Sequence, residues 1–374
     1  MTKEAICSFA LGKIFKYEPR LANEAVEIFG GAAELLGLGP EGIMESLGPY
    51  NKYAQKIASV DIIQEAERLE QIEKQGFRYL CHDNSAFPEP LRMCEDAPLG
   101  FFVRSEDSFE NIFSQDFIAI VGTRDASSYG IAWTEKVVGE LAGVESRPCI
   151  VSGLAYGIDI CAHKAALNSS LTSIAVLGTG IDTIYPSRHE YWADRLIHTP
   201  GCAVISEHPP GAEVLGINFL SRNRIIAGLG RATLLMESRV KGGGMTTARV
   251  AESYGRSVLA LPGRVDDPRS QGCNQLISNR IADPISDCDQ LLKALGYKKR
   301  GHKSEGQRTP PASSGFKSED IRILLETIRL SRDLNAEQLA KECGFAYKDV
   351  AALLPLLESE GLIRVDLLGR ASVV

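Results

Sequence analysis

The middle of the chain contains FIAIVG (117–122), CIVSG (149–153), SIAVLG (173–178), CAVISE (202–207), ATLLME (232–237) and SVLALPG (257–263). Each segment is apolar and rich in residues that favour strands, and each interval between them has room for one helix. Continuous apolar strands that alternate with helices are typical of a parallel sheet covered on both faces. We therefore predict an α/β fold with a Rossmann-like parallel sheet core over residues 116–295.

The regions on either side of this core have different patterns. Residues 1–80 have apolar residues at helical spacing, as in LANEAVEIFGGAAELL (21–36), and predict a helical domain. Prolines interrupt residues 81–115, which predict a short strand and a connector. Residues 296–317 are rich in Gly, Pro, Ser and Lys and predict a flexible basic linker. Residues 318–374 predict three helices and a small hairpin, the pattern of a winged helix-turn-helix domain.

The composition is that of a soluble globular protein. The chain has 374 residues, of which 44% are apolar and 24% are charged. No apolar run is long enough for a transmembrane helix, and the N-terminus lacks the features of a secretory signal. The nine cysteines include no C-x-x-C pair, which argues against a zinc site and a disulfide framework. We expect a cytoplasmic protein with no membrane contact, no metal and no cofactor.

Charge is distributed unevenly along the chain. The net charge is −7, which by itself argues against a general nucleic-acid binder. Residues 218–280, however, contain ten Lys and Arg against four Asp and Glu, and residues 298–317 contain six against one. A basic band within an acidic protein favours an anionic ligand. The alternative, a solvated and salt-bridged face, is less favoured because glycine-rich loops share the band.

The first core strand ends in a candidate anion-binding loop. Gly122 allows close approach of the backbone, Thr123 carries a hydroxyl, and Arg124 carries a permanently charged guanidinium. The helix that follows should direct its first N–H groups to the same point. Ser152 and Gly153 end the next strand at the same edge of the sheet. The loop does not match G-x-G-x-x-G, so a dinucleotide cofactor is not expected.

Two later segments, NFLSRNRIIAGL (218–229) and KGGGMTT (241–247), are the richest in candidate binding residues. These candidates are Phe219, Arg222, Asn223, Arg224, Lys241, Gly242, Gly243, Gly244, Thr246 and Thr247. Arginine binds phosphate with two hydrogen bonds, asparagine can bond a base edge, and an aromatic ring can stack on a base. Successive glycines at a helix start present several N–H donors to an anion. The Walker A order of residues is missing, so ATP hydrolysis is not supported.

The sequence favours a binding surface over a catalytic centre. Asp159 and His163 lie on one helix face, but two ligands are too few for a metal site. We interpret Asp159 as a helix cap and His163 as a hydrogen-bonded structural residue. No nucleophile motif is present, and carboxylates are sparse in the basic band, so we expect no catalytic residue.

Seven segments, in this order, strongly resemble the DNA-processing protein A family (DprA, also called Smf): GTR, SGLAYGIDICAH, AVLGTGIDTIYP, ISEHPPG, RNRIIAGL, GGGMTTA and LALPGRVDDPRSQGCNQLI. The resemblance covers residues 100–290. It implies homodimeric proteins that bind and protect single-stranded DNA and load the RecA recombinase during natural transformation. It also implies a helical domain of the SAM or HhH type before the core and a winged helix after it.

The family's motifs transfer to this chain with some departures. Its G-S/T-R motif falls on Gly122 to Arg124, its RNR motif on Arg222 to Arg224, and its S-G-S-L-I-T-A loop on Gly242 to Ala248. Where the family usually has Phe-Pro before RNR, this chain has Phe-Leu-Ser. The segment KIFKYEPRL replaces the P-G-I-G hairpin expected near the N-terminus.

The main hypothesis is a DNA-binding mediator that has no enzymatic activity. We expect the phosphates to bind in one pocket at the carboxyl edge of the sheet, whose rim is formed by Arg124, the amides of Ser152 and Gly153, Arg222, Arg224 and the Gly242–Gly244 loop. Bases would stack on Phe219 or Tyr185 beside the phosphate-binding residues. The alternative is a nucleotide-processing hydrolase of the phosphoribohydrolase (lysine decarboxylase-like) type, with Glu252 as its acid. Residues 319–370 contain seven Lys and Arg against ten Asp and Glu. This acidity favours a packing or partner-docking role for the winged helix over reading of a DNA groove.

Overall fold

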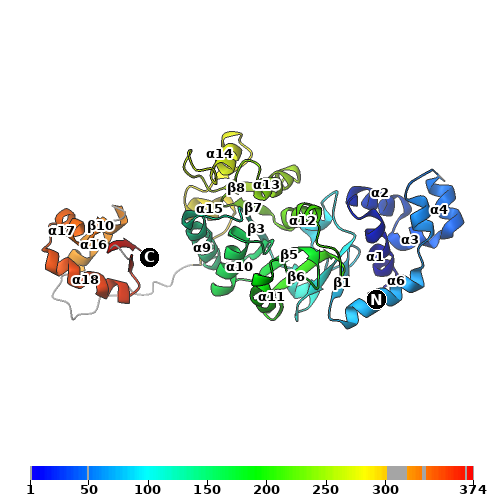
Figure 1. Cartoon of the computed structure of the whole chain (residues 1–374), viewed down its shortest axis with the longest axis horizontal. Helices are drawn as coiled ribbons and strands as arrows, with labels where there is room; N and C mark the ends of the chain where they lie inside the picture. Colours follow the sequence, from blue (N-terminus) through cyan, green and yellow to red (C-terminus); the bar gives the residue numbers. More distant parts are fainter. Residues whose placement is uncertain (1, 49, 301–317, 331–333, 367–368, 374) are drawn as a thin grey trace. The chain divides into compact units, whose positions relative to one another are not determined.

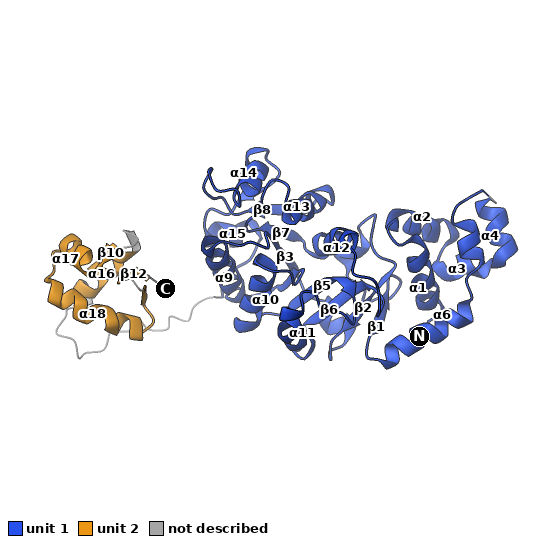
Figure 2. Cartoon of the chain, in the orientation of Figure 1, with its two compact units in different colours: residues 1–300 blue, residues 301–374 orange. Residues whose placement is uncertain are grey.

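The structure is a computed structural model that describes residues 2–48, 50–300, 318–330, 334–366 and 369–373. The chain divides into two compact units, residues 1–300 and 301–374 (Figure 2). Each unit has a hydrophobic core of its own. None of the helices in the described ranges is long and apolar enough to span a membrane.

A nine-stranded sheet runs through the first unit in the order β1-β2-β6-β5-β4-β3-β7-β8-β9 (Figure 1). Its strands are β1 (Arg78–Cys81), β2 (Gly100–Arg104), β3 (Phe117–Val121), β4 (Cys149–Ser152), β5 (Ser173–Gly180), β6 (Ala203–His208), β7 (Ala232–Leu235), β8 (Ser257–Ala260) and β9 (Asp283–Pro284). The six predicted apolar segments form β3 to β8, and all neighbouring pairs among them are parallel. The predicted parallel α/β core is confirmed.

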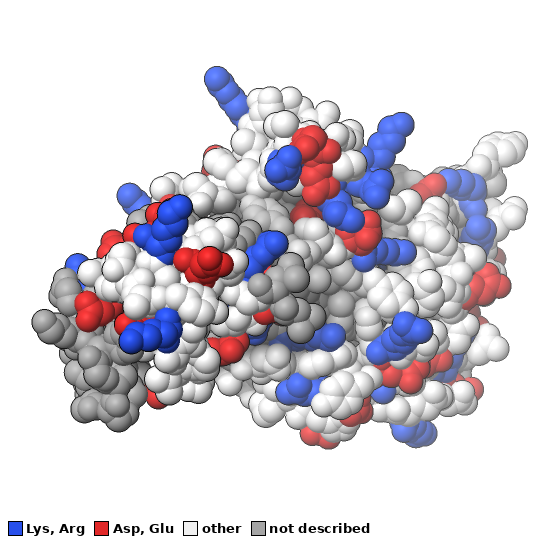
Figure 3. All heavy atoms as spheres, turned by 60° about the vertical axis from the view of Figure 1, so that its left-hand side comes forward, with Lys and Arg blue, Asp and Glu red and all other residues white. Residues whose placement is uncertain are grey.

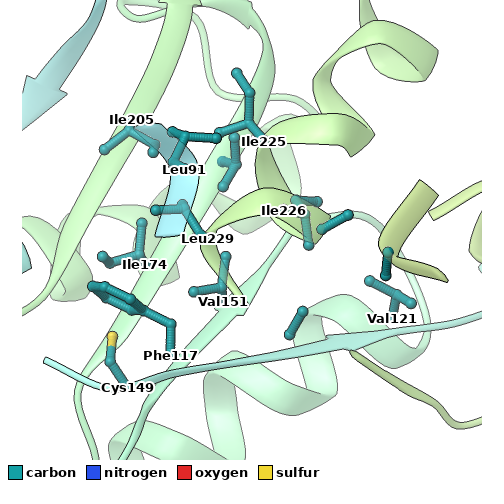
Figure 4. Packing of buried hydrophobic residues seen from close by; sticks show 14 of the residues in the cluster. Leu91, Phe117, Val121, Cys149, Val151, Ile174, Ile205, Ile225, Ile226 and Leu229 are labelled. Atoms are coloured by element: carbon teal, nitrogen blue, oxygen red, sulfur yellow. The ribbon is translucent and has the colours of Figure 1, made fainter. Parts of the chain in front are cut away.

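Helices cover both faces of the parallel part of the sheet. They are α9 (Ser128–Ala142), α10 (Ile158–Asn168), α11 (Glu190–Ile197), α12 (Gly216–Leu229), α13 (Gly243–Ser253), α14 (Gln271–Ser278) and α15 (Cys288–Ala294). Phe117 of β3 packs in one core cluster with Ile225 and Leu229 of α12 (Figure 4), whereas Ile118 packs in another with Val137 of α9. Burial on both faces explains why these strands are continuous apolar runs.

Two antiparallel strands extend the sheet beyond its parallel part. Strand β1 pairs with β2, and β2 pairs with β6. The sequence predicts one short strand and a connector here, but the structure has β2 and the short helices α7 (Glu89–Arg92) and α8 (Phe109–Phe113) between β1 and β3. The apolar run GFFVR of β2 begins just after Pro98. The sequence pattern therefore did not distinguish this strand from the predicted connector.

Six helices precede the sheet in the described N-terminal residues. They are α1 (Lys3–Phe15), α2 (Pro19–Phe29), α3 (Ala32–Gly37), α4 (Gly39–Leu47), α5 (Ala54–Ala58) and α6 (Ile62–Lys74). The helical pattern of residues 21–36 is split between α2 and α3, because Gly30 has a φ of 81° and Gly31 a φ of 154°. Helix α1 packs on the sheet edge, where the Phe9 ring lies 5.9 Å from that of Phe102 (Figure 1).

The second unit contains three helices and a small antiparallel sheet. The helices are α16 (Ser318–Leu330), α17 (Ala336–Cys343) and α18 (Tyr347–Ser359), and the strands are β10 (Leu334–Asn335), β11 (Ile363–Val365) and β12 (Arg370–Val373) in the order β10-β12-β11. Asn335 begins α17 with a capping box to Gln338, and Gly344 ends the helix with a φ of 71°.

The predicted linker begins later than expected. Tyr297 donates a hydrogen bond to the Asp116 carboxylate, and Lys299 Nζ lies 3.0 Å from Glu140 Oε2. Residues 296–300 are therefore held on the first unit. The rest of the predicted linker, residues 301–317, lies outside the described residues.

Candidate functional site

Strands β3 and β7 are neighbours in the sheet, and the chain continues from them to opposite faces of the sheet. Strand β3 leads to α9 on one face, and β7 leads to α13 on the other. Such a topological switch point leaves a crevice outside the carboxyl ends of the strands. A cavity of about 310 Å³, here called the switch-point cavity, occupies this place. The predicted binding residues that line it are Gly122, Thr123, Arg124, Phe219, Arg222, Asn223, Gly242, Gly243, Gly244 and Thr247.

Arg124 lies at the rim of the switch-point cavity and is exposed. Its Cζ is 5.9 Å from the centre of the Phe219 ring, a distance at which a cation and an aromatic face attract each other. The Phe219 ring lies 5.3 Å from the ring of Tyr185, which is 46% exposed. The Arg124 guanidinium and the Phe219 ring therefore line the cavity, and the Tyr185 ring lies against Phe219, which suits contacts to a phosphate and to base faces.

Arg222 lines the cavity from α12, but the side chain is only 5% exposed. Its Nη1 donates to the carbonyl oxygen of Gly153 at 2.9 Å and to that of Val176. Burial lowers the pKa of Arg222 to about 10 and raises the pKa of Asp159, although the opposite charges of the two groups favour their ionised forms. Arg222 thus supplies a fixed positive charge in the cavity wall, while its hydrogen bonds go to the protein.

Arg224 does not reach the cavity. It follows Arg222 by two positions on α12, so the two side chains leave the helix about 200° apart. Arg224 is 6% exposed, and its Nη2 lies 2.5 Å from Glu207 Oε1. The expectation that Arg124, Arg222 and Arg224 meet at one rim is therefore corrected: the first two line the cavity, and the third forms a buried ion pair elsewhere.

The N-terminus of α13 forms another side of the cavity. Gly242 is the N-cap, and Gly243 and Gly244 begin the helix, so their N–H groups have no partner within it. A Cβ added to Gly244 would lie 3.2 Å from Gly122 Cα, so the glycines allow the two loops to approach each other. Thr247 is buried, and its Oγ1 donates to the carbonyl oxygen of Gly243 at 3.3 Å.

The remaining predicted residues lie beside the cavity or behind it. Lys241 and Thr246 are exposed in an adjoining groove along α13. Ser152 is fully buried, and its hydroxyl donates to the carbonyl oxygen of Ile120 at 2.6 Å. The carbonyl oxygen of Gly153 accepts a hydrogen bond from Arg222. The structure therefore gives Ser152 and Gly153 a supporting position instead of a place in the cavity lining.

The N-terminus of α9 is not open to a ligand, contrary to the sequence prediction. The N–H group and the hydroxyl of Ser127 donate to the carboxylate of Glu237, at 2.8 and 2.5 Å. Glu237 is 1% exposed, and its main-chain carbonyl accepts from the N–H group of Thr123 at 2.7 Å. A carboxylate of the protein therefore occupies this anion position and complements the helix dipole. Of these two helix N-termini, only that of α13 is therefore open to a bound anion.

The structure agrees with the interpretation of His163 and corrects that of Asp159. His163 is buried, and its Nδ1 lies 2.7 Å from Ser173 Oγ. Asp159 does not cap its helix, because α10 has Gly157 at the N-cap position, with a φ of 75°. Asp159 instead lies in the first turn of α10, where it is 8% exposed and lines the switch-point cavity.

Buried His163 makes the fold sensitive to acid. Burial lowers the pKa of His163 from 6.5 to about 3, so the stability that depends on its neutral form is present above pH 6.5 and is lost as the pH falls toward 3. We expect this group to account for about 2–3 kcal/mol of lost stability between pH 7 and pH 4.5. Urea unfolding of His163→Asn at both pH values should show a correspondingly smaller pH dependence than the wild type. An equal pH dependence would contradict this assignment.

Charge elsewhere on the first unit does not offer a better site for a polyanion. A larger cavity, of about 690 Å³, has an acidic lining that includes Glu4, Glu24, Glu27, Asp83 and Glu95 beside two arginines. On the face in Figure 3, Lys and Arg side chains stand among Asp and Glu side chains instead of forming one continuous basic area. At the switch-point cavity itself, Arg124, Arg222 and Arg239 supply positive charge.

The described residues give the hydrolase alternative no suitable acid. Glu252 is exposed in the last turn of α13 and does not line the cavity. Asp159 does line it, but its charge faces the neighbouring Arg222. Within the described ranges, no group of three or more His, Cys, Asp or Glu could hold a metal ion.

Two exposed residues of the cavity lining were not among the predicted binding residues. Arg239 is 62% exposed, and its Nη2 lies 3.6 Å from Asp125 Oδ2. Leu220 is 57% exposed on α12. A signal for Arg239 exists in the sequence, since it is a further cation between the end of β7 and the glycine-rich loop. Leu220 has no such signal, because an exposed leucine on a helix is common.

Comparison with known proteins supports a specific relationship. A family model for DNA recombination-mediator protein A matches residues 78–296, which include the whole lining of the switch-point cavity. Protein Smf of Synechocystis sp. is 38% identical over 229 residues, which are 61% of this chain and 56% of that protein. This chain therefore matches little more than half of the length of that relative.

Two solved structures extend the similarity to the fold. DNA processing protein A (DprA) of Streptococcus pneumoniae has a TM-score of 0.66 and 28% identity, and the match covers 80% of this chain and 99% of that one. DprA of Helicobacter pylori, whose structure concerns a unique single-stranded DNA binding mode, has a TM-score of 0.52 and 26% identity, over 59% of this chain and 98% of that one. On the family match and these similarities, the chain belongs to the DNA recombination-mediator protein A (DprA/Smf) family.

Proposed function

We propose that this chain binds single-stranded DNA in the switch-point cavity and acts as a recombination mediator with no enzymatic activity of its own. The observation that carries the proposal is the meeting of Arg124, the buried charge of Arg222 and the first N–H groups of α13 at one opening beside Phe219. A flexible strand can place a phosphate on these donors and a base on the ring. Such contacts carry little sequence information, so we expect weak sequence preference.

The relatives support the same ligand and suggest its context. The H. pylori relative is described by its single-stranded DNA binding mode, and the family model by recombination mediation. We propose that this chain likewise protects incoming single strands and loads RecA onto them during natural transformation, in the cytoplasm. We also propose that it acts as a homodimer, because two linked cavities on one strand would raise affinity through effective concentration.

We assign the N-terminal helices to a SAM- or HhH-like domain and residues 318–373 to a winged helix that docks a partner or packs on one. Helix α18, which would be the recognition helix, has one cation, Lys348. Its exposed surface includes Tyr347, which is 59% exposed, and Leu356, which is 51% exposed. A helix that reads a DNA groove is normally basic, so apolar contact with protein fits α18 better.

Equilibrium binding to labelled oligonucleotides tests the proposed function. Titration by fluorescence anisotropy should show tighter binding to single-stranded than to double-stranded DNA of the same length. Affinity should fall as salt rises, with a slope of log K against log salt of about −1.4 to −2 if two or three phosphates are bound. Tighter binding to the duplex, or binding that salt does not change, would contradict the proposal.

A further inference from the structure

A groove adjoins the switch-point cavity along α13. It has a volume of about 490 Å³ and is bordered by Leu220, Lys241, Thr246 and Arg249. The groove and the cavity share Leu220 together with the backbone of Gly242 and Gly243. The two hollows therefore meet at the glycines, where no side chain separates them. We call the second hollow the α13 groove.

The charge of the α13 groove has one sign. Lys241 and Arg249 are both exposed, and no Asp or Glu lines the groove. Neither cation takes part in an ion pair or hydrogen bond with another described residue, unlike Arg239 of the cavity, which faces Asp125. Two free cations next to an anion-binding cavity offer a second position for phosphate. They should therefore attract a chain of phosphates more strongly than a single anion.

Exposed apolar side chains also line the α13 groove. Leu220 on α12 is 57% exposed, and Val240 beside the glycine-rich loop is 38% exposed. Together with the methyl and hydroxyl groups of Thr246, these side chains can contact a sugar or a base edge. Cations together with accessible apolar groups are the features of sites that bind single strands through phosphates and base faces.

We propose that a bound single strand passes from the switch-point cavity over Gly242 and Gly243 into the α13 groove, where Lys241 and Arg249 bind its next phosphates. This inference rests on the proposed function and specifies its ligand: the site takes an internal segment of a single strand, with no need for a free 5′ or 3′ end. Arg249 lies two turns beyond Gly242 on α13, so one helix provides main-chain donors to the cavity and a guanidinium to the groove.

The test compares two strand lengths and two arginines. The DNA affinities of Arg249→Ala and Arg249→Glu are measured with two oligothymidylates. One is shorter than four nucleotides, about the shortest site size of single-strand binders, and the other is much longer. We expect Arg249→Ala to leave the short ligand unchanged and to weaken the long one about 5- to 10-fold, with a larger loss in Arg249→Glu. Circular single-stranded DNA should compete as well as linear DNA of equal length. Arg68→Ala is the matched control, because Arg68 is an exposed arginine of α6.

The outcomes separate this inference from the proposed function. If Arg249→Glu binds long strands like the wild type while Arg124→Ala does not, the passage through the α13 groove is wrong and the cavity stands. Equal loss with short and long strands would place Arg249 in the cavity and overturn the groove as a second position. Conversion of Arg249→Glu to a smaller species in size-exclusion chromatography would make the groove a subunit contact, which also overturns the inference. No loss with Arg124→Ala would instead refute the proposed function.

Discussion

Arg124→Ala is expected to weaken the binding of single-stranded DNA by about 10- to 100-fold at fixed salt. The guanidinium is exposed at the rim of the switch-point cavity and is oriented by the Phe219 ring, so it is free to bind a phosphate. Removal of one phosphate contact should also reduce the salt slope by about 0.7, and by the same amount for all sequences. Fluorescence anisotropy at two or more salt concentrations measures both effects.

The controls for Arg124→Ala are its stability and an arginine elsewhere. Because Arg124 is exposed and packs on one ring, the midpoint of thermal unfolding should stay close to that of the wild type. Arg68→Ala removes an exposed arginine from α6 and should leave DNA binding unchanged. A folded Arg124→Ala protein that binds as tightly as the wild type would show that the phosphate lies elsewhere.

Arg222→Ala is expected to act on the fold itself, with a loss of about 3–5 kcal/mol in the free energy of unfolding. The substitution leaves the carbonyl oxygens of Gly153 and Val176 without their donor and leaves Asp159 buried without its neighbouring positive charge. Urea unfolding at pH 7 measures the loss. Arg222→Ala should therefore impair DNA binding mainly by reducing the folded population.

A second variant distinguishes the electrostatic part of this effect. Asp159→Asn combined with Arg222→Ala removes the buried carboxylate that Arg222 compensates. If uncompensated charge causes most of the loss, the double variant should be more stable than Arg222→Ala alone. A double variant that is less stable by the sum of the two single losses would show that the lost hydrogen bonds and packing dominate.

The parallel core and the place of its ligand site could be predicted because both depend on local patterns. Strands such as FIAIV are buried on both faces, so each is a continuous apolar run, and parallel strands direct the loops that follow them to one edge. Gly122 and Arg124 come just after β3, and Gly242 to Gly244 end the connection from β7 and begin the next helix, so their common location needed no knowledge of side-chain directions. The same reasoning could not separate Arg222 from Arg224, since their opposite directions depend on the exact turn of α12.

The errors arose where a contact between distant segments or a local backbone conformation determined the structure. The N-terminus of α9 looks open in the sequence, because nothing local to it suggests that a carboxylate more than a hundred residues later will occupy it. Likewise, the change from α2 to α3 depends on the positive φ of Gly30, and a glycine pair within a helical pattern is compatible with a continuous helix as well as with a break. Tertiary contacts and backbone conformation decided both cases.

The pairing of Glu237 with Ser127 has a mechanical consequence. Separation of the β7 loop from α9 would expose a carboxylate whose hydrogen-bond partners lie on the other segment, so this side of the opening resists deformation. Across the opening, no side chain of the described residues caps the start of α13, and the N–H group of Gly242 donates only to the nearby carbonyl oxygen of Arg239. When a ligand enters, adjustment should be concentrated on the α13 side. Amide hydrogen exchange should therefore be faster at Gly243 and Gly244 than at Thr123 and should slow there on saturation with DNA.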